Sequence, residues 1–98
     1  MPPFKSETVE SSLVQLGADI RVARIRQRIK LADLAERMGV SVPTARAVEQ
    51  GRPTVQIGHV ARALDALQML KGLETAASAK WDVLGTAMEA DRLPKTVR

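Results

Sequence analysis

The residues of this sequence that are best suited to chemistry are arginines and lysines, and they are concentrated in one third of the chain. Eight basic residues and only three acidic ones lie between Arg21 and Arg52, whereas the whole chain of 98 residues has a formal net charge of +4. Clustered cations bind polyanions such as nucleic acids, because they neutralise phosphates and release condensed counterions. A solvated helix face shows the same pattern, so charge alone leaves both interpretations open.

The aromatic and reactive residues narrow the class of ligand. Phe4 and Trp81 are the only aromatic residues, whereas proteins that bind single-stranded nucleic acids stack bases on exposed rings. Duplex DNA is therefore favoured over RNA. Cysteine is absent and His59 is the single histidine, so neither a disulfide framework nor a multi-histidine metal site is available. We expect no enzyme activity, no cofactor and no metal.

No pattern in the sequence directs the chain to a membrane. The first residues lack the charged and then apolar composition of a signal peptide. No apolar run approaches the roughly 20 residues that a membrane-spanning helix requires. We therefore expect a cytoplasmic protein.

The elements that would position the basic residues are helices. Residues 1–12 are rich in proline, serine and glutamate, show no periodicity and are predicted to form a flexible arm. Arginines are interleaved with the apolar residues that follow, which predicts an amphipathic first helix. These apolar residues have the helical spacing of three and four, at Leu13, Leu16, Ile20 and Ala23.

Two short helices joined by a glycine turn are predicted next. The apolar pattern of residues 31–38 ends at Gly39, which is suited to the left-handed conformation that follows many helices. Ser41 is a good N-cap for the second helix of this pair, over about residues 42–50. Pro43 lies in the first turn of that helix, where its missing N–H costs little. Such a pair can present its second helix to the major groove of DNA.

The two faces of this helix pair are predicted to differ. The residues expected to face the core are Leu34, Ala35, Val40, Ala45 and Val48. The residues expected on the outward face of the second helix are Val42, Pro43, Arg46 and Ala47. A generic helical hairpin within a bundle is the alternative interpretation.

The C-terminal part of the chain is predicted to contain a fourth helix over about residues 55–67, a fifth after Gln68 and a sixth near Trp81. Residues 68–92 are too apolar for a solvated tail and too short for a second core, so we expect a helical dimerisation or partner segment there, followed by a tail at residues 93–98. Its interface residues are expected to be Leu70, Leu73, Trp81, Leu84 and Met88. The alternative location of the dimer interface is the first helix or the N-terminal arm.

One pattern resembles a known family, and its residues are the run from Leu31 to Ser41 followed by Thr44, Val48, Glu49 and Gly51. This pattern is similar to the helix-turn-helix family of Cro and the phage repressors, the XRE type. The similarity covers about residues 16–67, nearly all of a predicted DNA-binding domain of residues 13–67. It implies a lambda-repressor-like bundle that binds a palindromic operator in double-stranded DNA as a homodimer.

The resemblance also implies which residues contact DNA. The recognition positions correspond to Val42, Pro43, Arg46 and Ala47, and the positions near phosphates to Ser41, Thr44 and Gln50. Arg46 is the recognition residue able to bind guanine in a bidentate manner, while the apolar residues can contact thymine methyl groups or read DNA shape. Lys30 and Arg52 are expected to bind phosphates through their charge.

Two positions are implied to be structural, and two depart from the family pattern. Arg24 and Glu49 match residues that form an intramolecular ion pair in similar proteins. Glu49 is therefore expected to orient the helix of residues 42–50. The family usually has serine or threonine and then glutamine where this chain has Lys30 and Leu31. The helix of residues 31–38 is therefore expected to lack a side-chain cap at its N-terminus.

The sequence supports more than one function. The stretch from Arg52 to Gly58 and the ending from Leu93 to Arg98 resemble a HipB-like antitoxin subgroup, whose members also neutralise a HipA-like kinase toxin. This resemblance implies an autorepressor of the antitoxin kind. The alternatives are a stand-alone XRE-type regulator without a toxin, and a helix-turn-helix module that mainly holds a protein partner.

Overall fold

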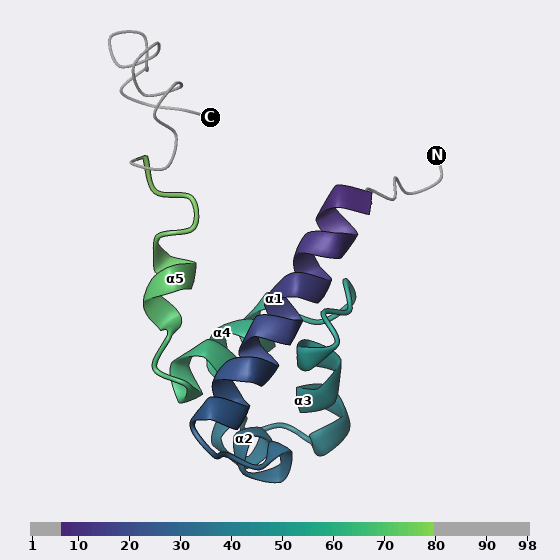
Figure 1. The fold of residues 1–98 in the computed structure, drawn as a ribbon, viewed down its shortest axis with the longest axis vertical. Helices are drawn as coiled ribbons and strands as arrows, with labels where there is room; N and C mark the ends of the chain where they lie inside the picture. Colours follow the sequence, from purple (N-terminus) through teal and green to yellow (C-terminus); the bar gives the residue numbers. More distant parts are fainter. Residues whose placement is uncertain (1–6, 80–98) are drawn as a thin grey trace, which may run out of the picture.

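The computed structural model describes residues 7–79 of the chain (Figure 1). Within these residues the regular secondary structure is helical. They are α1 (Glu7–Arg26), α2 (Leu31–Met38), α3 (Val42–Glu49), α4 (Ile57–Ala66) and α5 (Leu70–Glu74). The predicted all-α fold is confirmed. The sixth predicted helix, with Trp81, Leu84 and Met88, lies outside the described residues. Within residues 7–79, no helix combines the length and the apolar character needed to cross a membrane.

The first helix begins earlier than the sequence pattern indicates. α1 begins at Glu7, so the prediction of a flexible arm is wrong for residues 7–12. Glu7 and Glu10 lie in the first turn, where negative charge is favoured by the helix dipole. A helix that is already anchored by its later turns can extend without an apolar stripe. Figure 1 shows these N-terminal turns reaching beyond α2, α3 and α4.

The hydrophobic core lies where α1, α2, α3 and α4 meet. The largest fully buried side chains are those of Ile20, Leu34, Met38 and Leu67. Four of the five residues predicted to face the core are buried, and Val40 is half-buried against them. That prediction is confirmed, because the period of 3.6 residues fixes which face of each short helix is apolar.

Two glycines allow α1 to cross the C-terminal end of α3 at close range. A Cβ atom on Gly17 would lie 2.6 Å from the backbone oxygen of Glu49 and 2.6 Å from the backbone nitrogen of Gly51. A Cβ atom on Gly51 would meet the backbone of Leu13, and Gly51 also has a φ of 66°. Backbone therefore packs on backbone at this crossing, and neither position has room for a side chain.

The fifth helix is shorter than the apolar pattern suggests and packs within its own chain. α5 ends at Glu74, and the residues after it form a turn. Leu73 is half-buried against the core, and Leu70 is also half-buried. These two residues, predicted for a dimer interface, are thus partly covered by the same chain.

Candidate nucleic-acid interface

The turn between α2 and α3 has the local geometry that the sequence predicts. Gly39 has a φ of 72°, and its N–H donates to the carbonyl oxygen of Glu36 at 3.0 Å. The hydroxyl oxygen of Ser41 accepts a hydrogen bond from the backbone N–H of Thr44 at 3.3 Å, and Pro43 lies in the first turn of α3. A left-handed glycine and a capping serine therefore set the angle between the two helices.

The N-terminus of α2 lacks a side-chain cap, as expected from Lys30 at this position. Lys30 has an extended backbone and makes no capping hydrogen bond with its side chain. Leu31 is half-buried against the core and has no polar group, so it cannot make the contact expected of a glutamine at this position. Lys30 is exposed, and its ammonium group can reach a phosphate only as a point charge.

The outward face of α3 is less exposed than the sequence pattern predicts. Arg46, Pro43 and Gln50 are exposed, but Val42 and Ala47 are half-buried. Val42 packs against the core cluster, because the first turn of α3 rests on α2. Among the four predicted recognition residues, Arg46 alone has a side chain that can form hydrogen bonds, and it is exposed.

Two hollows flank α3 and bring together six of the nine predicted contact residues, whereas Lys30, Ser41 and Val42 line neither. Arg46 and Gln50 line a hollow between α3 and α1, together with Arg21 and Leu31. Sequence reasoning missed Arg21, although it belongs to the basic run that first indicated a polyanion ligand. Because Arg21 and Arg46 border one hollow, the positive surface extends from α3 onto α1.

The other hollow lies between α3, the loop after it and the start of α4. It brings together the predicted residues Pro43, Thr44, Ala47 and Arg52. It also includes three residues that the sequence analysis did not assign to DNA, namely Thr54, Gln56 and His59. No acidic residue lines this hollow. The signal that could have found the three residues is that they lie within seven positions after Arg52.

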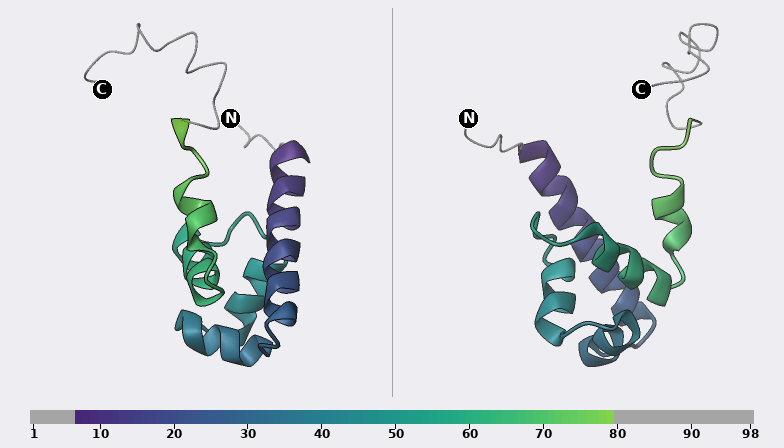
Figure 2. Two further views of the ribbon diagram at one scale, coloured as in Figure 1. Left: turned by 60° about the vertical axis from the view of Figure 1, so that its left-hand side comes forward. Right: turned by 180° about the vertical axis from the view of Figure 1, so that it is seen from behind.

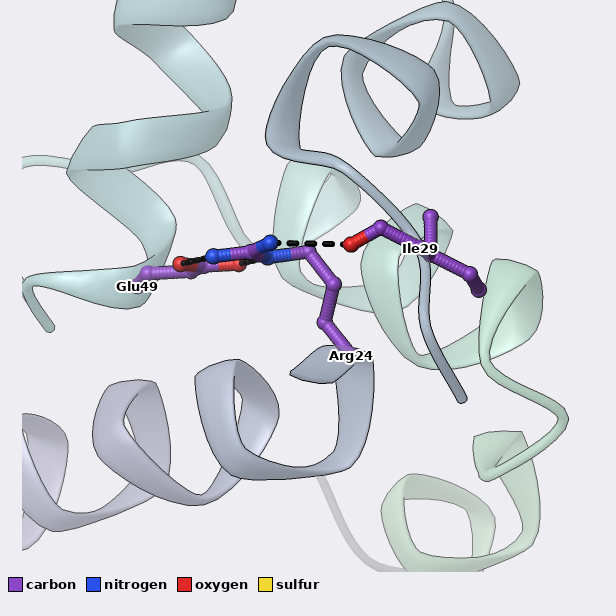
Figure 3. Close-up of polar contacts among 3 residues, drawn as sticks. All are labelled: Arg24, Ile29 and Glu49. Carbon is purple, nitrogen blue, oxygen red and sulfur yellow. Dashed lines mark hydrogen bonds and ion pairs between the residues drawn. The ribbon is translucent and has the colours of Figure 1, made fainter. Parts of the chain in front are cut away.

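Arg24 on α1 and Glu49 on α3 form a buried ion pair. The Nε atom of Arg24 lies 2.6 Å from one carboxylate oxygen of Glu49, and a second guanidinium nitrogen lies 3.1 Å from the other. The third nitrogen donates to the carbonyl oxygen of Ile29 at 2.9 Å (Figure 3). The side chains are only 12% and 6% exposed. The carboxylate of Glu49 is therefore held by Arg24, although Glu49 also borders the hollow that Arg46 and Gln50 line.

The basic residues predicted to contact DNA are not paired with neighbouring carboxylates. Within residues 7–79 the ion pairs are Arg24–Glu49 and the exposed pair Lys71–Glu74. Arg46, Arg52 and Lys30 take part in neither. Their charges are available to an anionic ligand.

The comparison with known protein families agrees with this geometry. A family model described as a helix-turn-helix domain matches residues 15–78, which include α2, the turn and α3. No curated protein and no solved structure matches the chain. The matched residues cover more than half of the chain and agree with the XRE-type resemblance. The protein therefore belongs to this family of helix-turn-helix DNA-binding domains.

Proposed function

We propose that the protein is a sequence-specific repressor that binds an operator in double-stranded DNA through α3. The observation that carries the proposal is the exposed guanidinium of Arg46 on a helix anchored from below by the Arg24–Glu49 pair. A rigid helix with an arginine on its outer face suits the major groove, where guanine presents two acceptors. The test is selection of bound sequences from a random pool of duplex DNA, and no enrichment would contradict sequence-specific binding.

Replacing Arg46 by alanine is expected to remove base discrimination at one position of the selected site. The loss of one bidentate contact costs about 1 to 3 kcal/mol there and relaxes specificity. The measurement is the affinity of wild type and variant for the selected duplex and for single-base variants of it. An equal loss of affinity on selected and random duplexes would show that Arg46 does not read a base.

Replacing Arg52 or Lys30 by alanine is expected to weaken binding equally on all sequences. Each change removes one phosphate contact per bound copy, so the slope of log affinity against log salt concentration should fall by about one for each copy on the DNA. The matched control is Lys71→Ala, which removes the same charge from α5. A salt slope as steep as that of wild type in both variants would remove Arg52 and Lys30 from the interface.

We also infer that the repressor binds as a homodimer on a palindrome. α3 has eight residues and one exposed arginine, so a single copy offers few base contacts. Two copies related by a twofold axis would place their recognition helices in successive major grooves, roughly 34 Å apart. The expected footprint is therefore two inverted half-sites separated by one turn of duplex, and a single half-site would contradict the inference.

The finer proposal is that this repressor is an antitoxin that binds a HipA-like kinase toxin and regulates its own operon. It is supported by the similarity of the segments Arg52–Gly58 and Leu93–Arg98 to HipB-like proteins. The test is purification of the complete protein from its native host and identification of bound kinase and bound DNA. DNA without a kinase would favour the stand-alone regulator. A partner protein whose binding is insensitive to salt, with no specific DNA, would favour the interaction module.

A further inference from the structure

Two apolar hollows lie side by side between α1 and the α4–α5 end of the domain. One is also lined by the loop after α3 and the other by α5, and both share Leu16, Ile20 and Leu73. We call the continuous surface the α1–α5 groove, and its main wall residues are Leu13, Leu16, Ile20, Ile57, Met69 and Leu73. In Figure 2, α1 and α5 stand on opposite sides of this region.

The α1–α5 groove leaves large apolar side chains in contact with water. Leu16 is 37% exposed, Met69 42% and Ile57 72%. The charged residues that line it are limited to Asp19 and Arg52. A continuous apolar surface of this kind is unfavourable in water unless another apolar surface covers it. The groove therefore needs an occupant with an apolar stripe.

We propose that residues 80–92 of the same chain occupy the α1–α5 groove, with Trp81, Leu84 and Met88 against its walls. Ala76 already lines one of the two hollows, so the chain runs along the groove until just before this segment begins. Nineteen residues follow Ala79, which is enough for the proposed segment. A segment joined directly to the wall of a groove has a high effective concentration there. Consecutive elements of a chain also usually pack as neighbours.

The spacing of the apolar residues matches on the two sides. Leu13, Leu16 and Ile20 on α1 follow one another at intervals of three and four residues. Trp81, Leu84 and Met88 have the same intervals in the same order. Two helical stripes with equal spacing can interdigitate along their length, about 10 Å for seven residues. The occupant thus fits the groove in both character and span.

This placement gives Trp81, Leu84 and Met88 a surface within their own chain, in place of the dimer interface predicted from the sequence. The proposed homodimer would then use another face of the protein. The inference does not depend on DNA binding. A protein that failed to select an operator would still fill its own groove.

The test uses the fluorescence of the full chain, because Trp81 is its only tryptophan and tyrosine is absent. In wild type, the emission of Trp81 should lie at short wavelength, resist quenching by acrylamide and be independent of protein concentration. Leu16→Glu should shift the emission to longer wavelength and increase quenching severalfold. Val22→Glu is the matched control, because Val22 is also exposed on α1 but lines neither hollow. This control should behave as wild type.

A second pair of variants keeps the test valid if the Leu16→Glu protein does not fold. Leu84→Glu should release Trp81, whereas Thr86→Glu should not, and neither change alters residues 7–79 that form the groove. Emission typical of a fully solvated tryptophan in wild type would overturn the proposal. So would unchanged emission in both Leu16→Glu and Leu84→Glu. Protection that is lost on dilution would assign the groove to a second copy instead.

Discussion

Gly17→Ala is expected to destabilise the domain by up to about 3 kcal/mol and Gly51→Ala by more, about 2 to 6 kcal/mol, because two costs add there. At Gly17 the new methyl group would lie 2.6 Å from two backbone atoms of the α3 end, so α1 would have to move away from α3. At Gly51 the methyl group would meet the backbone of Leu13, and the φ of 66° adds conformational strain for any residue with a Cβ atom. Overpacking and left-handed strain each cost about 1 to 3 kcal/mol.

Gly58→Ala and Gly72→Ala are the matched controls for this experiment. Both glycines lie in helices, and an added Cβ atom meets no other atom within 4 Å at either position. Alanine should be neutral or stabilise these helices by up to about 1 kcal/mol. The measurement is unfolding by urea followed by circular dichroism. If Gly17→Ala unfolded at the same midpoint as Gly72→Ala, the close crossing of α1 and α3 would be wrong.

Glu49→Ala is expected to destabilise the fold by about 3 to 5 kcal/mol, while leaving base preference unchanged. The change leaves the guanidinium of Arg24 without its partner at a site where the two side chains are only 12% and 6% exposed. Removing one partner of a buried pair costs far more than the pair contributes, because the remaining charge is desolvated. The measurements are denaturant unfolding and selection of bound sequences from random duplex DNA.

The exposed pair on α5 provides the control for Glu49. Lys71 and Glu74 are 3.9 Å apart, and both side chains are more than half exposed. Solvent screening makes such a pair worth less than about 1 kcal/mol, so Glu74→Ala should unfold almost as wild type does. A Glu49→Ala variant with normal stability but a different selected sequence would assign Glu49 to base reading instead.

The helix-turn-helix could be predicted from the sequence because strong local preferences define its ends. Gly39 ends α2 in the left-handed region, and Ser41 with Pro43 begins α3. Each preference acts within one turn of chain, so no knowledge of distant contacts is required. The apolar period then specifies which residues are buried. Ala45 and Val48 on α3 are examples.

Features that depend on contacts between distant elements could not be predicted in this way. The apolar period indicates that Leu73 requires burial, but not that the covering surface is the core of the same chain. Likewise, the position of Gly17 in a helix gives no indication that α3 crosses at that point. The start of α1 was also missed. Residues 7–12 have no apolar stripe that would predict a helix, and they extend a helix that is anchored by its later turns.

The sequence predicted the main residue of the candidate site but not all of the residues that border it. The sequence places Arg46 on the outer face of α3, and the structure leaves it exposed there. Helical periodicity cannot show that Arg21 on α1 borders the same hollow, because that proximity arises from the packing of α1 against α3. It also cannot show that Val42 is half-buried, since this depends on the contact of α3 with α2.

The three-point attachment of Arg24 has a consequence for the thermodynamics of ligand binding. One planar guanidinium joins Glu49 on α3 to the carbonyl group of Ile29, the residue directly before Lys30. The N-terminal end of α2 and the C-terminal end of α3 are thereby held in one orientation before any ligand arrives. A preorganised surface loses little backbone entropy on association. The entropic cost of ordering should therefore fall on long side chains such as Arg46, so Arg46→Ala should bind with a smaller unfavourable entropy than wild type in a calorimetric titration.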